Sequence, residues 1–225
     1  MVVSVTEAAD RLGVSSLRVR QLIASGRLAA DRVGGRYVIA EADLDRFGVL
    51  AAHRPWKPGS VWGLLWLIEN RPVPWLTAKQ LQRARGRAEQ GLRAHLDVVG
   101  SRAASAGFRA HGSAIRRLGM DARLVRSGVS ALGDVGVDLV GGVDEVEGYV
   151  RRKDLDRIAS DYGLVAERAR PNVWLHVVDD PWPFENGEEV APPLVVALDL
   201  LDHDDERLQR AGRDLLSTVL GDGAP

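Results

Sequence analysis

Short apolar stripes separated by glycines mark the first 26 residues of the chain. The spacing predicts a helix over residues 5–12 that Thr6 caps and Gly13 ends, because a hydroxyl oxygen accepts the free N–H groups of a first turn and glycine tolerates the left-handed conformation. A second helix is expected over residues 16–25, where apolar side chains recur at helical spacing before Gly26. Two short helices so close together predict a helix-turn-helix.

Two β-prone runs follow, at residues 29–33 and 36–39, and the pair Gly34-Gly35 joins them. Such an arrangement predicts a β-hairpin. Residues 43–47 then predict a short helix that covers the core. A helix, a turn, a second helix, a β-hairpin (the wing) and a third helix within fifty residues are the arrangement of a small DNA-binding domain.

Polar side chains occupy the outward face of the second predicted helix and the tip of the hairpin, where small or hydrogen-bonding groups suit base edges and arginines suit phosphates. Three features follow one another in the expected order: the glycines that end the helices, the glycine pair of the wing and a closing Asp-Leu-x-x-Phe. They lie in the stretch SVTEAADRLGVSSLRVRQLIASGRLAADRVGGRYVIAEADLDRF. Over residues 3–47 the chain thereby resembles the winged helix-turn-helix of the excisionase and MerR-like group. The resemblance implies a DNA-binding domain over residues 1–50, with major-groove contacts from Ser16, Arg18, Arg20 and Gln21 and wing contacts from Arg32 and Arg36.

The middle segment, residues 56–120, begins with an apolar helix over residues 61–69 that Ser60 can cap. Trp62 and Trp66 lie four residues apart in this run, so we expect them in a core rather than on a stacking platform for single-stranded nucleic acid.

A second helix of the middle segment is capped by Thr77 and extends toward Leu96, and arginine dominates its polar face. We expect this basic helical segment to be a second DNA-contacting module through Arg83 and Arg87.

The last third, residues 121–225, mixes strand and helix patterns. Alternating apolar residues predict strands over residues 123–126, 137–140, 146–150 and 173–178. Helical patterns occupy residues 151–162, 194–201 and 206–220. The whole chain is therefore expected to be α+β, with a winged helix-turn-helix, a basic helical middle segment and a small acidic α+β domain.

Charge divides the chain sharply. Formal charges sum to +1 over residues 1–50, +10 over residues 51–130 and −12 over residues 131–225, which gives the net charge of −1. Because a basic segment attracts a polyanion and an acidic segment is repelled by it, we expect the two segments to face different partners, DNA and a protein. The alternative is that they neutralise each other within one globule.

Three stretches of the last third are similar to the C-terminal region of abortive-infection-type antitoxins: RLVRSGVSALG, VEGYVRRKDLDRIASDYGLV and VAPPLVVALDLLDHDDERLQRAGRDLL. The resemblance implies a bacterial regulator that represses its own promoter. It also implies that the acidic part counteracts a nucleotidyltransferase toxin. The expected partners are double-stranded DNA, a cognate toxin protein and a second copy of the chain in a homodimer.

Composition excludes several classes of protein. The chain has no cysteine, which excludes disulfides, thiolate metal sites and thiol nucleophiles. Its longest apolar run, residues 61–68, is far shorter than the roughly 20 residues of a membrane span. The N-terminus lacks the basic and then apolar pattern of a secretion signal. We therefore expect a cytoplasmic protein with no cofactor.

Acidic clusters raise a metal-dependent nuclease as an alternative function. Asp179-Asp180 and residues 202–206, with His176 and His203 nearby, could hold a hard cation. Residues 202–206 also suit the first turn of the terminal helix, where carboxylates stabilise the helix dipole. We therefore expect no enzyme, no catalytic residue and no metal site. A second alternative is a protein-interaction factor in which the helix-turn-helix is not the main activity.

Overall fold

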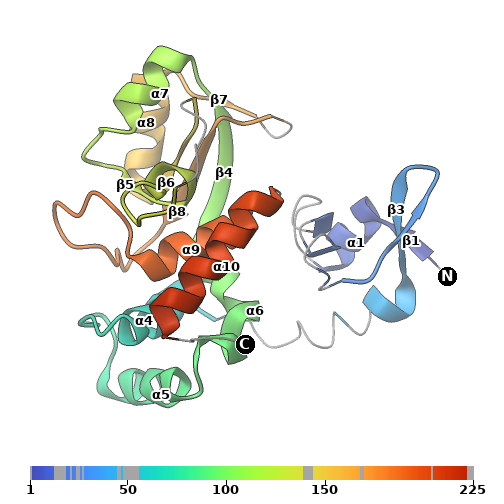
Figure 1. Cartoon of the computed structure of the whole chain (residues 1–225), viewed down its shortest axis with the longest axis horizontal. Coiled ribbons are helices and arrows are strands. Elements are labelled where there is room, and N and C mark those ends of the chain that lie inside the picture. The colour runs from blue at the N-terminus through green and yellow to red at the C-terminus, as the bar shows by residue number, and fades with distance from the viewer. Residues whose placement is uncertain are drawn as a thin grey trace. The chain divides into compact units, whose positions relative to one another are not determined.

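The computed structural model describes residues 2–12, 19–20, 22–23, 26, 28–44, 47, 56–138, 144–167, 170–203 and 205–221. The chain divides into two compact units (Figure 1), one of Met1–Pro55 with Asp202–Asp205 and one of Trp56–Leu201 with Glu206–Pro225. We call them the N-terminal unit and the C-terminal unit. Helices and sheets are both present, so the fold class is α+β, as the sequence predicts.

The N-terminal unit holds a three-stranded antiparallel sheet in the order β1-β3-β2. Its elements are β1 (Val2–Ser4), α1 (Val5–Leu12), β2 (Asp31–Val33) and β3 (Arg36–Ala40), and residues 19–20, 22–23, 41–44 and 47 are also helical. One apolar cluster joins these elements and includes Val3, Ala8, Val19, Leu22, Ile39 and Leu44. The predicted hairpin is confirmed. The strand β1 was not predicted, because only its pairing with β3 distinguishes three residues as a strand.

The first helix is capped by Ser4 rather than by Thr6, so the predicted cap was wrong. The Glu7 backbone N–H donates to Ser4 Oγ at 3.2 Å, and the Ser4 backbone N–H donates to Glu7 Oε2 at 2.8 Å. This reciprocal pair is a capping box. The bonds that Ser4 donates lower the pKa of Glu7. The pattern Ser-x-x-Glu therefore starts α1 one residue before Thr6.

A five-stranded sheet in the order β5-β6-β8-β4-β7 forms the centre of the C-terminal unit. Its strands are β4 (Ala104–Arg109), β5 (Val125–Arg126), β6 (Val146–Arg151), β7 (Val165–Ala166) and β8 (Val173–Val178). The pair β6 and β8 is parallel, and the other neighbours are antiparallel.

Helices cover both faces of this sheet. On one face Val146, Val150 and Leu175 form an apolar cluster with α7 (Gly112–Leu118) and α8 (Leu155–Tyr162). On the other face Tyr149 and Val178 belong to the larger core, which joins α4 (Pro58–Ile68), α9 (Pro193–Leu201) and α10 (Glu206–Leu220). Because strand side chains alternate between faces, Glu147 and His176 also point toward the α4 and α9 side.

The expected boundary between residues 56–120 and 121–225 does not separate two units. β4, from the basic segment, lies between β8 and β7 and forms hydrogen-bonded ladders with both. Trp62 and Trp66 of α4 are buried in the same core as α9, which confirms that they are core residues. Basic and acidic segments therefore fold as one unit.

Two other helix boundaries differ from those predicted. α4 starts at Pro58 with Lys57 at its cap, rather than after Ser60, because proline is well suited to the first helical turn. α5 (Ala78–Glu89) ends before Gly91, which has a φ of 78°, and a separate short helix, α6 (Leu96–Val99), follows after a 3₁₀ turn. The capping of α5 by Thr77 is confirmed.

Residues 137–138 do not form the start of the predicted strand, and residues 139–140 lie outside the described part of the chain. None of the helices in the described ranges is long and apolar enough to cross a lipid bilayer.

Candidate nucleic-acid interface

The wing of the N-terminal unit is a two-residue hairpin between β2 and β3. Gly34 and Gly35 have positive φ angles of 57° and 77°, which this tight turn requires. Arg32 pairs with Tyr37 across the hairpin, and its guanidinium lies 5.0 Å from the centre of the Tyr37 ring. The side chains of Arg32 and Arg36 are both exposed. The wing therefore presents two cations to solvent beside its tip.

Arg20 lies on a helical segment whose apolar neighbours belong to the core. Val19 and Leu22 are buried, whereas Arg20 is exposed. A helix that buries its neighbours on one face leaves Arg20 on the outer face, where a DNA duplex can reach it. The DNA contacts predicted for three further residues stay predictions, because these lie outside the described residues: Ser16, Arg18 and Gln21.

Several arginines of the basic middle segment are neutralised inside the C-terminal unit. Each pairs with a carboxylate of the acidic last third: Arg71 with Glu188 at 2.8 Å, Arg102 with Asp199, Arg123 with Asp161 at 2.9 Å, and Arg126 with Asp134 at 2.7 Å. The alternative that the two segments neutralise each other is confirmed for these four arginines.

The two arginines predicted to contact DNA from α5 differ from each other. Arg83 is exposed, whereas Arg87 is half-buried and its guanidinium lies 3.6 Å from the centre of the Trp56 ring. Burial, followed by the neighbouring charge of Arg83, lowers the pKa of Arg87. One face of Arg87 is therefore occupied by Trp56, and Arg83 is the more accessible cation.

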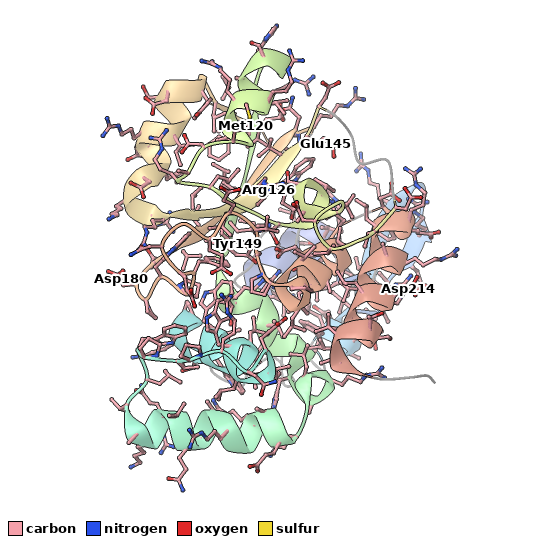
Figure 2. All side chains as sticks on the ribbon, turned by 60° about the vertical axis from the view of Figure 1, so that its left-hand side comes forward. Met120, Arg126, Glu145, Tyr149, Asp180 and Asp214 are labelled. Atoms are coloured by element: carbon pink, nitrogen blue, oxygen red, sulfur yellow. The ribbon has the colours of Figure 1, made fainter. Side chains whose placement is uncertain are left out.

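The acidic clusters considered as metal ligands do not assemble in the described part of the chain. Asp179 is exposed and pairs with Arg152 at 3.2 Å, and Asp180 is exposed at the periphery (Figure 2). His176 lies on β8 with its side chain buried, and the carboxylates beside it are those of Glu147 and Asp199. Asp204 lies outside the described residues.

A different cluster of ionisable side chains is buried between α9, which carries Asp199, and the five-stranded sheet. Asp199 is fully buried and accepts hydrogen bonds from Arg102, Ser127 and Tyr149, of which the bond from the Tyr149 hydroxyl is 2.8 Å long. Arg102 Nε also donates to the Tyr149 hydroxyl oxygen at 2.8 Å. Figure 2 shows Tyr149 in the interior of the C-terminal unit.

Glu147 and His176 extend this cluster across the sheet. His176 Nε2 lies 2.9 Å from Glu147 Oε1 and 3.9 Å from Asp199 Oδ1. The backbone N–H of Val129 donates to the second Glu147 oxygen at 3.0 Å. Residue 128 must be glycine, because a Cβ there would overlap the Glu147 carboxylate and the φ of 49° is left-handed. We call Arg102, Glu147, Tyr149, His176 and Asp199 the buried network.

Burial and charge oppose each other at His176. Burial alone lowers the pKa of His176, but the Asp199 charge and the hydrogen bond to Glu147 outweigh it, so the pKa of His176 is raised. Burial also raises the pKa of Tyr149, which keeps its hydroxyl protonated. With His176 protonated, two cations face two carboxylates and the buried network is neutral.

Glu147, His176 and Asp199 have the residue types and the proximity of a metal site, since their ligand atoms lie within 4.8 Å of one another. However, both carboxylate oxygens of Asp199 and both of Glu147 already accept hydrogen bonds from protein donors. The positive charge of Arg102, which contacts Asp199, would also repel a metal cation. These residues therefore fit an internal ion-pair network better than they fit a metal ion.

Sequence patterns singled out His176 but not the network. A usable signal existed, because each carboxylate interrupts an apolar run: Glu147 in VEGYV and Asp199 in VVALDLL. Ionisable groups are rarely buried unless paired, so such interruptions predict partners in the interior.

One comparison with known proteins produced a match. A family model described as a helix-turn-helix domain matches residues 2–47, whereas no curated protein and no solved structure matches the chain. The matched range contains the sheet β1-β3-β2, the wing arginines Arg32 and Arg36, and Arg20. Residues 2–47 are therefore a helix-turn-helix DNA-binding segment, in agreement with the range 3–47 predicted from the sequence.

Proposed function

We propose that the chain is a sequence-specific DNA-binding transcription regulator that acts without a catalytic step. The helix-turn-helix match over residues 2–47 carries the proposal, and the exposure of Arg20, Arg32 and Arg36 supports it. In a winged helix-turn-helix the second helix enters the major groove. Arg20 then contacts base edges, and the wing arginines contact phosphates or the minor groove.

The test is binding of the full chain to duplex DNA from its own upstream region, measured by fluorescence anisotropy at several salt concentrations. Because phosphate contacts release counterions, log K should fall linearly with log salt. Arg20→Ala should lose about 1–3 kcal/mol of discrimination between the operator and a scrambled duplex. Arg32→Ala should weaken binding to both duplexes equally.

Affinity that does not change with salt would contradict the proposal. Equal losses for Arg20→Ala and Arg32→Ala on both duplexes would contradict the division between base and phosphate contacts. Plasmid DNA incubated with the chain and Mg²⁺ should remain intact, since cleavage that Asp180→Ala abolished would favour the metal-dependent nuclease instead.

We also propose that this regulator is an autorepressing antitoxin whose C-terminal unit binds a nucleotidyltransferase toxin. The support is the resemblance of three stretches to abortive-infection-type antitoxins. These stretches contain β5, β6, α8, α9 and most of α10, all of which belong to the C-terminal unit.

Co-purification of the full chain with the product of the neighbouring gene tests the antitoxin proposal. The double variant Arg32→Ala/Arg36→Ala should lose promoter repression while still relieving toxicity, because the changes lie on the wing. If this variant lost both functions while remaining folded, the separation between DNA binding and toxin binding would be wrong. If wild type relieved toxicity without binding DNA, the chain would be a protein-interaction factor.

A homodimer is part of the same proposal. Two half-sites should then lie about 34 Å apart along the duplex, or a multiple of that distance, because dimeric helix-turn-helix proteins contact successive turns of one face. Footprinting on the upstream DNA measures this spacing, and a single unrepeated half-site would contradict the dimer.

A further inference from the structure

The outer face of α5 carries cations without carboxylate partners. Lys79 and Arg83 stand four residues apart, so they lie on one face of the helix, and both are exposed, whereas Ala84 faces the core. Within the described ranges neither cation makes an ion pair or a side-chain hydrogen bond. Arg71, Arg102, Arg123 and Arg126 of the same basic segment all have such partners.

Like charges on this face repel one another. Lys79, Arg83 and Arg87 follow at intervals of four residues, a spacing at which equal charges destabilise a helix. The Arg83 charge contributes to the lowered pKa of Arg87. An external anion would relieve this repulsion.

Gly86 lies on the same face and has no packing role in the described part of the chain. A Cβ at this position would meet no atom within 4 Å. A helix with glycine at an interior position is less stable than one with alanine there. Because alanine would fit at position 86, the glycine calls for an explanation other than packing. A glycine between cations allows close approach of a ligand to the helix backbone.

α5 is also held firmly. A capping box closes its N-terminus: the Gln80 backbone N–H donates to Thr77 Oγ1 at 3.4 Å, and the Thr77 backbone N–H donates to Gln80 Oε1 at 2.9 Å. Near its other end Arg87 stacks on Trp56, the first residue of the C-terminal unit. Only eight residues separate Trp56 from Phe47 in the sequence, so a duplex bound by the N-terminal unit is tethered to the C-terminal unit by a short connection.

We propose that the outer face of α5, formed by Lys79, Arg83 and Gly86, binds the phosphate backbone of the duplex that the N-terminal unit recognises. This inference rests on the proposed function. DNA is favoured over an acidic protein because residues 1–50 carry a net charge of only +1, whereas affinity for DNA at physiological salt depends on phosphate neutralisation. The contact adds affinity without base preference.

The test compares two double variants of the full chain that each remove two exposed cations. Lys79→Gln/Arg83→Gln alters α5, and Arg116→Gln/Arg117→Gln alters α7, which lies at the opposite end of the C-terminal unit in both views (Figures 1 and 2). Affinity for operator and scrambled duplexes is measured across a salt series, and circular dichroism checks folding. The α5 variant should bind both duplexes roughly 10- to 60-fold more weakly at about 0.1 M salt, with a salt slope reduced by about 2. The α7 variant should bind like wild type.

Each other outcome overturns the inference in a different way. Equal losses for the two double variants would show a general charge effect. An unchanged salt slope for the α5 variant, together with weakened binding by Arg32→Ala, would remove α5 from the DNA contact and leave the proposed function intact. If wild type showed no salt-dependent DNA binding, both the α5 contact and the proposed function would be wrong.

Gly86→Ala gives a second measurement that does not alter charge. It should raise the thermal stability of the chain while weakening DNA binding several-fold, because the added methyl group blocks close approach. Stronger or unchanged DNA binding by Gly86→Ala would contradict the close approach of the backbone. If the α5 double variant lost binding to an acidic protein partner but not to DNA, the face would belong to that protein.

Discussion

The buried network and the outer face of α5 place the cations of one basic segment in opposite environments. Arg102 is buried against Asp199 and Tyr149, whereas Arg83 is exposed with no partner in the described part of the chain. The first cation is part of the interior, and the second is available to a ligand. A segment's net charge therefore does not measure the charge that it offers to DNA, since internal pairing removes part of it.

Removing the carboxylate of Asp199 should give the largest effect on stability. It tests most directly whether the buried Arg102 is structural and the exposed Arg83 is not. Asp199→Ala leaves Arg102 buried without its counter-ion, and we expect a loss of about 3–5 kcal/mol in the free energy of unfolding. Arg83→Ala should change it by less than about 0.5 kcal/mol. Urea denaturation followed by tryptophan fluorescence measures the C-terminal unit alone, because all six tryptophans lie within residues 56–201.

The double variant Arg102→Met/Asp199→Leu is the control for the Asp199 prediction. It removes both charges and should recover most of the loss, because a well-packed apolar pair replaces a buried ion pair at little cost. If Asp199→Ala cost no more than Arg83→Ala, the ion pair would not be part of the stable interior.

His176 should give the next largest effect, as a pH dependence of stability. Its pKa is raised in the folded chain, so its contribution is complete below the unfolded pKa of about 6.5 and is lost as the pH rises through the folded pKa. Relative to His176→Gln, wild type should lose up to about 1.4 kcal/mol per pH unit in that window. Denaturation curves at several pH values test this. A difference between wild type and His176→Gln that stays constant across this pH range would contradict the prediction.

The smallest effect should be a difference in stability between two of the three arginines of α5, Arg87 and Arg85. Arg87→Ala removes the contact with Trp56 and should cost about 1 kcal/mol, since a cation over an indole ring stabilises and the side chain also covers the ring. Arg85→Ala, on the same helix and exposed, should cost less than about 0.5 kcal/mol. Equal effects in thermal melts would mean that the stacking of Arg87 on Trp56 contributes nothing.

Much of the N-terminal unit was predictable because its signals are local. The glycine pair at the wing tip and the Ser4-x-x-Glu7 pattern at the start of α1 each act within a few residues. The exposure of Arg32 and Arg36 follows from a hairpin tip that projects into solvent. Even here the predicted cap, Thr6, was wrong, although the capping-box spacing favours Ser4, which stands three residues before Glu7.

The C-terminal unit was predictable in its strongest strands and helices but not in its assembly. The runs that form β6 and β8 are rich in valine, which favours strands. β4 has the sequence ASAGFR, which has no β-branched residue, and it is a strand because β8 and β7 supply its hydrogen bonds. That pairing joins residues about 70 apart in the sequence, so no local pattern reveals it.

The amino-acid sequence by itself determined the helix-turn-helix, the alternating faces of β6 and β8, and the uneven distribution of charge along the chain. Tertiary structure alone decided which charges meet, because Arg102 and Asp199 are 97 residues apart and become neighbours only when α9 covers the sheet. Burial then requires these ions to pair, while exposure leaves Lys79 and Arg83 solvated. The same residue type is therefore structural in one place and a candidate ligand-binding group in another.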